Sequence, residues 1–176
     1  MTLIALAAAA FTSAPAMAEK NIVIDGSTTV GPIAKAFADY YKEKTGIGAA
    51  ISESGSGNGV KSLINGACDI ANMSRFMKDS EFKTCVGKGI LPVAHVVAFD
   101  GLAVVVNPAN KVGALTMAQL ADIYTGKIRN WKELGGDDAE IVVISRDTNS
   151  GTYETFNELV LRKNPVVKGA EYVGSN

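Results

Sequence analysis

Short apolar runs alternate along the chain with segments in which apolar residues recur every three or four positions, and polar or glycine-rich turns separate them. The first pattern predicts strands and the second predicts helices. Strands that alternate with helices favour a mostly parallel sheet with helices on both faces. The predicted strands are residues 21–25, 49–53, 69–72 and 141–145. The predicted helices are residues 32–45, 59–65, 79–86 and 152–161, with a further one that carries Leu120, Ile123 and Tyr124 behind a capping box at Thr116 and Gln119.

The run VAHVVAFDGLAVVV, residues 93–106, departs from this alternation. It is too apolar for a surface strand, so we expect it to be buried. Its interruption at Asp100 and Gly101 predicts a crossing between two domains. The predicted boundaries are a first α/β domain over residues 19–98 and a second one over residues 99–176.

Residues 1–18 carry no charge, and a short apolar core is followed by Ala16-Met17-Ala18, which fits a small-residue cleavage site. This arrangement predicts a secretory signal peptide, with a mature chain that folds outside the cytoplasm. The alternative is an apolar N-terminal helix that stays on the protein. No second long apolar stretch follows, so we expect a soluble mature protein.

The formal net charge is −1, which gives no electrostatic basis for binding nucleic acid. The content of 47% apolar and 20% charged residues is that of a globular protein, and we expect a monomer without a cofactor. Cys68 and Cys85 could form a disulfide in an oxidising compartment, or remain as two buried free thiols. A metal site lacks partners for them, because His95 is the only histidine.

Three turns rich in hydroxyl groups and glycine follow predicted strands and precede predicted helices, at residues 26–29, 53–59 and 146–152. Open parallel sheets bind ligands beyond the carboxyl ends of their strands, so these turns should share one rim. Backbone N–H groups at helix starts, hydroxyl groups and an arginine fork can together replace the water around a small oxyanion. The candidate groups are the hydroxyls of Ser27, Thr28, Ser56, Ser150 and Thr152, the backbone at Gly57 and Gly151, and the guanidinium groups of Arg75 and Arg146.

Each candidate also has a simpler interpretation. Serine and threonine before a helix are most often N-caps, and glycine in a turn usually serves backbone geometry alone. Arg146 beside Asp147 could be a solvated pair. The recurrence of the motif at three strand ends is what favours a ligand site.

Asp100 has two interpretations as well. A carboxylate beside an anion makes sense if the ligand donates a proton to it, as phosphate can and sulfate cannot. Alternatively, Asp100 begins a turn with Gly101 or pairs with an arginine for structure.

Five segments together resemble the periplasmic phosphate-binding proteins of phosphate ABC transporters. They are DGSTTVGPIAKAF, SGSGNGVKSLINGACDIANMSR, PVAHVVAFDGLAVVVNP, LADIYTGKIRNWKELGG and SRDTNSGTYETF. The resemblance runs from about Asn21 to the C-terminus. It implies a type II periplasmic-binding-protein fold, with two hinged α/β domains that close on a buried ligand. Family members usually continue for roughly another hundred residues, so we expect the second domain and the return crossing to be incomplete here.

The resemblance also implies which residues bind the ligand. Thr28 and the Thr29 backbone correspond to the first turn, Ser56 to the second, and Ser74 and Arg75 to the loop after the third strand. The second-domain donors would be Arg146, Ser150, Gly151 and Thr152. Asp100 is then the candidate for the carboxylate that accepts the ligand proton.

The resemblance implies that the protein captures inorganic phosphate and delivers it to a membrane permease. Binding of sulfate or molybdate, or a role as a phosphate sensor, are the alternatives, because they need the same kind of pocket. A hydrolase that uses Ser56 or Ser150 is disfavoured, since neither serine lies in a G-x-S-x-G elbow.

Overall fold

The computed structural model describes residues 21–174, and the predicted signal peptide, residues 1–18, lies outside these described residues. Helices and strands alternate, as the sequence predicts. In chain order the elements are β1 (Ile22–Gly26), α1 (Gly31–Thr45), β2 (Ala49–Ser52), α2 (Ser56–Ile64), β3 (Ile70–Asn72), α3 (Asp79–Gly87), α4 (Met117–Tyr124), the 3₁₀ turn η1 (Trp131–Leu134), β4 (Ile144–Arg146), α5 (Gly151–Phe156), the π-helical turn η2 (Asn157–Leu161) and β5 (Glu171–Val173).

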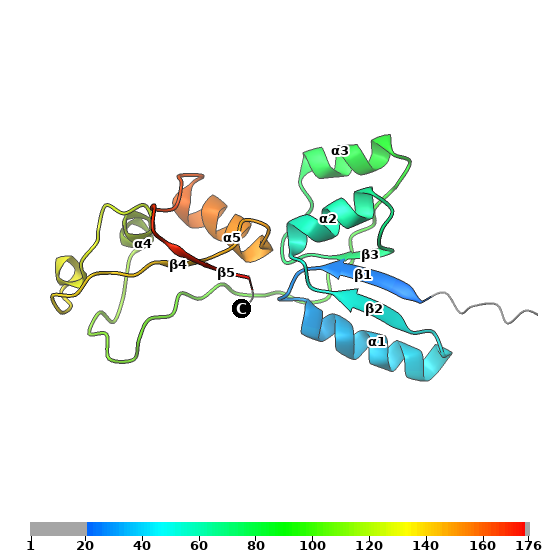
Figure 1. The fold of residues 1–176 in the computed structure, drawn as a ribbon, viewed down its shortest axis with the longest axis horizontal. Coiled ribbons are helices and arrows are strands. Elements are labelled where there is room, and N and C mark those ends of the chain that lie inside the picture. The colour runs from blue at the N-terminus through cyan, green and yellow to red at the C-terminus, as the bar shows by residue number, and fades with distance from the viewer. Residues whose placement is uncertain (1–20, 175–176) are drawn as a thin grey trace, which may run out of the picture.

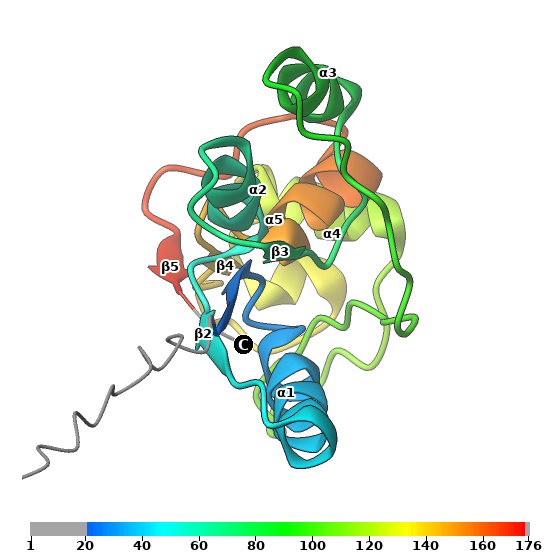
Figure 2. The ribbon, with the colours of Figure 1, turned by 90° about the vertical axis from the view of Figure 1, so that its right-hand side faces the viewer.

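The elements gather in two groups (Figure 1). We call β1 to α3 the N-terminal lobe and α4 to β5 the C-terminal lobe. In the N-terminal lobe, three parallel strands pair in the order β2-β1-β3, and α2 packs on β1 and β3. The helices α1 and α2 lie on opposite sides of this sheet (Figures 1 and 2), as predicted. In the C-terminal lobe β4 pairs in parallel with β5, a strand that the sequence analysis missed.

Each lobe has a small apolar core. In the N-terminal lobe, Val60 of α2 and Cys85 of α3 are almost completely buried. In the C-terminal lobe, Leu161 is buried, and the rings of Tyr124 and Phe156 lie 4.5 Å apart. Burial of this kind holds the helices against the sheets and so fixes the positions of the turns between them.

Local signals set the ends of the helices. The capping box of α4 is confirmed, because the Thr116 hydroxyl accepts the Gln119 N–H at 3.2 Å and Gln119 Oε1 accepts the Thr116 N–H at 2.9 Å. At the end of α1, Gly46 adopts a φ of 82° and donates its N–H to Lys42 O at 2.8 Å. α2 begins at Ser56 rather than at the predicted Gly59, so the glycine-rich turn itself forms the first turn of this helix.

The predicted burial of residues 93–106 is wrong for this structure. The run contains no helix or strand, and its side chains are exposed, up to 95% for Phe99. Among residues 21–174, no segment pairs with its backbone, and the one hydrogen bond within the run joins Gly101 N–H to Asp100 Oδ1. An apolar run is buried only when another segment covers it, and here none of the described segments does.

Candidate functional site

The first turns of α2 and α5 meet between the two lobes (Figure 1). Ser56, at the start of α2, is fully buried, and its Oγ accepts the Ser74 N–H at 3.2 Å and lies 3.3 Å from Ser74 Oγ. A Cβ on Gly151, at the start of α5, would collide with the hydroxyl oxygens of both serines. The structure therefore brings together three residues that the sequence analysis named from separate turns.

The backbone of the two turns also makes direct contact. Gly57 N–H donates to Asn149 O at 3.1 Å, and Gly55 packs against the same carbonyl group. Both glycines lie where a side chain would enter the junction between the lobes. The lobes are therefore closed on each other. The Gly57 N–H and the hydroxyl groups of Ser56 and Ser74, which could bind an anion, make hydrogen bonds within the protein instead.

Arg146 connects the third turn to the first. Its Nη2 donates to Thr28 Oγ1 at 3.1 Å and to Gly174 O at 3.1 Å, and its Nε donates to Val173 O at 3.3 Å. Arg146 ends β4 and Thr28 follows β1, so the contact crosses the lobes at the carboxyl ends of their strands. The expected common rim for the three turns is thus what the structure shows.

Two of the candidate serines accept hydrogen bonds from nearby backbone N–H groups. The buried Ser150 Oγ accepts the Tyr153 N–H at 3.4 Å at the start of α5. The buried Ser27 Oγ accepts the Val30 N–H at 3.4 Å before α1. The Ser150 contact matches the simpler N-cap interpretation, whereas Ser27 supports only the turn before α1, whose N-cap is Val30. Both serines still lie in turns that border the junction.

Arg75 follows β3 and points into an ionic cluster rather than to the serine hydroxyls. Its side chain is only 9% exposed. Its guanidinium group bonds to the carboxylates of Glu81 and Glu154 and to Phe76 O. Four of its five N–H donors are accounted for by these contacts, which leaves little capacity for an anion in this arrangement.

Asp100 lies in the exposed run, where its Oδ1 accepts the Gly101 N–H at 2.8 Å. This geometry matches the turn interpretation. Among the described residues, no hydrogen bond or ion pair links Asp100 to the junction between the lobes. A role for Asp100 in accepting a ligand proton stays a prediction.

The sequence analysis missed a different carboxylate, Asp25. It is the last residue but one of β1, is 9% exposed, and accepts hydrogen bonds from the hydroxyl groups of Ser52, Ser54 and Ser62 at 2.6–2.7 Å. These serines belong to β2, to the glycine-rich turn and to α2, so Asp25 ties together the segments that carry Ser56. A carboxylate at the end of a short apolar run, within the strand itself, was the signal that could have found it.

The surroundings of Asp25 stabilise its ionised form. Burial acts to raise the pKa of Asp25, but the hydrogen bonds from Ser52, Ser62, Ser54 and the Gly26 backbone outweigh it and lower the pKa below its ordinary value. The three neutral donors therefore hold a charged group close behind the glycine-rich turn.

Both cysteines are buried free thiols, so the possible disulfide between Cys68 and Cys85 is not formed. Cys68 Sγ is directed at Gly59 O of α2, at 3.8 Å. Burial, together with the charges of Asp25 and Asp69, raises the pKa of the Cys68 thiol. Of the two alternatives that the sequence left open, the structure favours the second.

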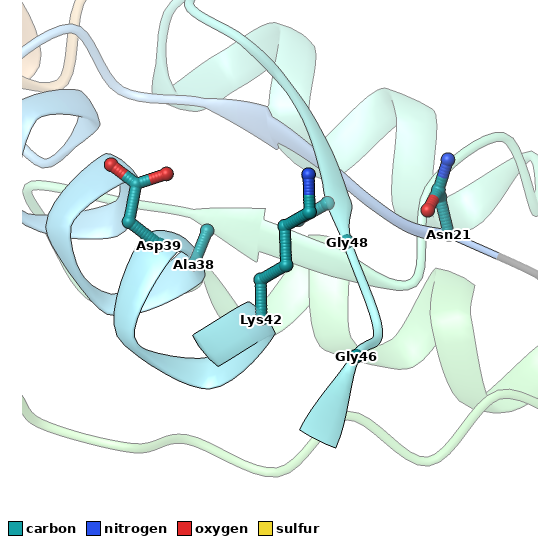
Figure 3. Close-up of a pocket in the computed structure, with 7 residues that line it drawn as sticks. Asn21, Ala38, Asp39, Lys42, Gly46 and Gly48 are labelled. Carbon is teal, nitrogen blue, oxygen red and sulfur yellow. The ribbon is translucent and has the colours of Figure 1, made fainter. Parts of the chain in front are cut away.

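A pocket of about 340 Å³ lies away from the junction (Figure 3). It is found where α1 ends and where β1 and β2 begin, at the opposite end of the sheet from the hydroxyl-rich turns. Its lining residues are Asn21, Ala38, Asp39, Lys42, Gly46, Gly48 and Ala49. Residues 21–174 include no group of histidine, cysteine, aspartate and glutamate side chains suited to a metal ion. Within the same residues, every helix is too short or too polar to cross a membrane.

Two curated relatives resemble most of the chain. Protein SphX from Synechococcus elongatus is 40% identical over 167 residues, which are 90% of this chain and 50% of the relative. The phosphate-binding protein PstS from Bacillus subtilis is 35% identical over 145 residues, which are 82% of this chain and 47% of the relative. The chain thus spans about half the length of these relatives.

Solved structures share the fold. A substrate-binding protein from Clostridium perfringens, solved with phosphate bound, superposes with a TM-score of 0.79 at 38% identity, over 89% of this chain and 63% of that one. An ABC-type phosphate transport receptor from Vibrio cholerae gives a TM-score of 0.69 at 36% identity, over 88% and 63%. These matches confirm the α/β fold of a periplasmic binding protein, and the chain covers 63% of each of the two solved chains. The sequence profile of the PBP superfamily domain matches residues 10–174, and the chain belongs to this family.

Proposed function

We propose that the chain supplies the anion-binding turns of a protein that captures inorganic phosphate outside the cytoplasm and delivers it to the permease of an ABC transporter. The observation that carries this proposal is the meeting of Ser56, Ser74 and Gly151 at the facing starts of α2 and α5. The names of the relatives, which include phosphate-binding proteins, support phosphate as the anion.

The chemistry of these groups suits a tetrahedral oxyanion. Serine hydroxyls and the N–H groups of a helix start are neutral donors, and the field at a helix start favours negative charge. Arg146 adds a planar cation that matches two oxygens of one anion. The proposed ligand set is Thr28, Thr29, Ser56, Gly57, Ser74, Arg146, Ser150, Gly151 and Thr152.

The lobes would separate to admit the anion and then close on it. The contacts of Ser56 with Ser74, and of Arg146 with Thr28, would give way to contacts with the ligand. Such an exchange costs little free energy, because each donor gives up a hydrogen bond to a protein acceptor and forms one to the anion. We propose that the two domains at residues 19–98 and 99–176 move as rigid bodies. Binding and release would involve no catalytic step.

Isothermal titration calorimetry of the purified chain with phosphate, sulfate and molybdate tests the proposal. We expect phosphate to bind more tightly than the other two anions. The Ser56→Ala variant should weaken phosphate binding at least about tenfold, since it removes a buried donor. Ser80→Ala, an exposed serine of α3, is the matched control and should bind as the unaltered chain does.

Other outcomes would select an alternative. Equal binding of sulfate and phosphate would remove the argument for a protonated ligand and indicate a general oxyanion receptor. Hydrolysis of a phosphate ester that disappears in Ser56→Ala would indicate an enzyme. The absence of any anion binding by a folded chain would contradict the proposal.

A further inference from the structure

A cluster of four charged side chains joins the two lobes beside the serine hydroxyls. Arg75 and Lys78 belong to the N-terminal lobe, and Glu154 belongs to α5 of the C-terminal lobe. Arg75 Nε bonds to Glu154 Oε2, and Lys78 Nζ donates to Glu154 Oε1 at 2.7 Å. One carboxylate thus accepts from two cations of the opposite lobe, with one oxygen for each.

The fourth member, Glu81, holds Arg75 in place from within its own lobe. Its two carboxylate oxygens accept from Arg75 Nη1 and Nη2 at 2.9 and 2.8 Å. Oε2 also accepts the Lys78 N–H at 2.8 Å at the start of α3. Burial acts to raise the pKa of Glu81, but its bonds to Arg75 and to Lys78 lower it, so this carboxylate stays ionised at neutral pH.

This arrangement fixes the Arg75 guanidinium group whether or not Glu154 is present. If the lobes part, Arg75 keeps its bidentate ion pair with Glu81. Of the carboxylate contacts of Arg75, the one that breaks is that to Glu154. The ionic bonds to Glu154 therefore belong to the closed arrangement alone. A contact made in one of two states shifts the equilibrium towards that state.

The cluster is also placed to act on the candidate site. Arg75 directly follows Ser74, and Glu154 lies one helical turn after Gly151. The Arg75 side chain is 9% exposed and that of Glu154 is 20% exposed, so solvent screens their attraction less than that of a surface pair. The contacts of Arg75 and Lys78 with Glu154 are made in the same arrangement that brings Ser74 and Gly151 together.

We propose that Glu154, with Arg75 and Lys78, forms an ionic latch between the lobes that holds the anion site closed. Arg75 is then a positioning residue for closure and does not bind the anion. The consequence for phosphate rests on the proposed function, whereas the latch itself concerns the two lobes with or without a ligand.

The Glu154→Gln variant tests the latch, because it removes the charge and keeps the shape. We expect it to release phosphate faster and to bind it about tenfold more weakly, since the closed state is less populated. Small-angle X-ray scattering of the anion-free variant should give a larger radius of gyration than that of the unaltered chain. The matched control is Glu158→Gln, an exposed glutamate of the following turn.

The two measurements separate the two proposals. If the unaltered chain binds no phosphate but Glu154→Gln still expands, the latch stands and the proposed function fails. If phosphate binds normally and Glu154→Gln changes neither affinity nor radius of gyration, the latch is overturned.

A further variant distinguishes a latch residue from an anion ligand. In the Glu154→Gln background, adding Arg75→Gln should weaken phosphate binding by less than about a further threefold, because the ion pair between Arg75 and Glu154 is already absent. An additional loss of a hundredfold or more would show that Arg75 contacts the anion and would contradict its role in the latch. Circular dichroism checks that each variant is folded.

Discussion

Gly151 and Ser56 are in contact across the two lobes, so closely that a Cβ on residue 151 would collide with the Ser56 hydroxyl. The two residues begin α5 and α2, and their contact sets how near the helix starts can come. Glycine at position 151 has an ordinary backbone conformation, so its small size, rather than its flexibility, is what the closed arrangement requires.

The Gly151→Ala variant should therefore keep its fold and lose closure. An added methyl group is tolerated at a helix start but would hold α5 away from α2. We expect phosphate binding, measured by calorimetry, to weaken at least about tenfold. Gly113→Ala, where nothing lies near the new methyl group, is the control. Unchanged binding by Gly151→Ala would contradict a closed arrangement of this kind.

Arg146→Ala should remove the cation of the proposed ligand set. Loss of one partner from a desolvated charge pair costs about 2–5 kcal/mol, so phosphate affinity should fall by more than about thirtyfold. Arg146→Lys keeps the charge without the planar fork, and we expect an intermediate affinity. Calorimetry of both variants checks this order, and near-normal binding by Arg146→Ala would exclude Arg146 as a ligand.

The local pattern predicted most elements of the N-terminal lobe. The strand at Ile22–Gly26 and the helix between Pro32 and Gly46 are confirmed, because apolar periodicity and end signals agree there. β5 was missed, since Glu171–Val173 is a short segment that becomes a strand only by pairing with β4. The local pattern of residues 93–106 alone did not reveal their exposure, because burial depends on which other segments are present.

The candidate site was predicted at the level of turns and less well at the level of contacts. Strand ends located Ser56, Gly151 and Arg146 correctly on one rim. The partners of Arg75 were not predicted, because Glu154 is far away in the sequence and meets it only through the packing of two lobes. Asp25 was overlooked for a similar reason: its three serine partners come from three different segments.

Asp25→Asn should destabilise the fold at neutral pH by about 1–3 kcal/mol, because the amide cannot accept all three serine hydroxyls. The pKa of Asp25 in the folded chain is lowered from 3.8, so the ionised carboxylate contributes to the free energy of unfolding at pH values above 3.8. The contribution is lost as the pH falls through the folded pKa. Urea unfolding of both chains should thus give a difference that is full at neutral pH and shrinks as the pH falls below 3.8.

The control for this experiment is Asp39→Asn, an exposed carboxylate of α1. It should unfold as the unaltered chain does at each pH. A difference between Asp25→Asn and the unaltered chain that stays constant over this range of pH would show that the charge of Asp25 does not contribute to stability.

Substitutions of two apolar residues should differ sharply in how much they lower the free energy of unfolding. Val60 is 1% exposed against the sheet, so Val60→Ala should lower the free energy of unfolding by about 2 kcal/mol. Phe99 is 95% exposed, so Phe99→Ala should change it by less than about 0.5 kcal/mol. Urea unfolding at neutral pH measures both. A large loss in Phe99→Ala would mean that the run 93–106 is covered in solution, by another segment or another molecule.

The two thiols should be unreactive in the folded chain. Cys68 is buried and the pKa of its thiol is raised, and Cys85 is completely buried, so neither offers an accessible thiolate. An aromatic disulfide reagent that releases a coloured thiolate should therefore titrate both cysteines in urea without any reductant, and neither in buffer. The melting temperature should not change when a reductant is added. If urea exposes no thiol until a reductant is present, the cysteines are paired, and the packing of Cys68 against α2 would have to be different in solution.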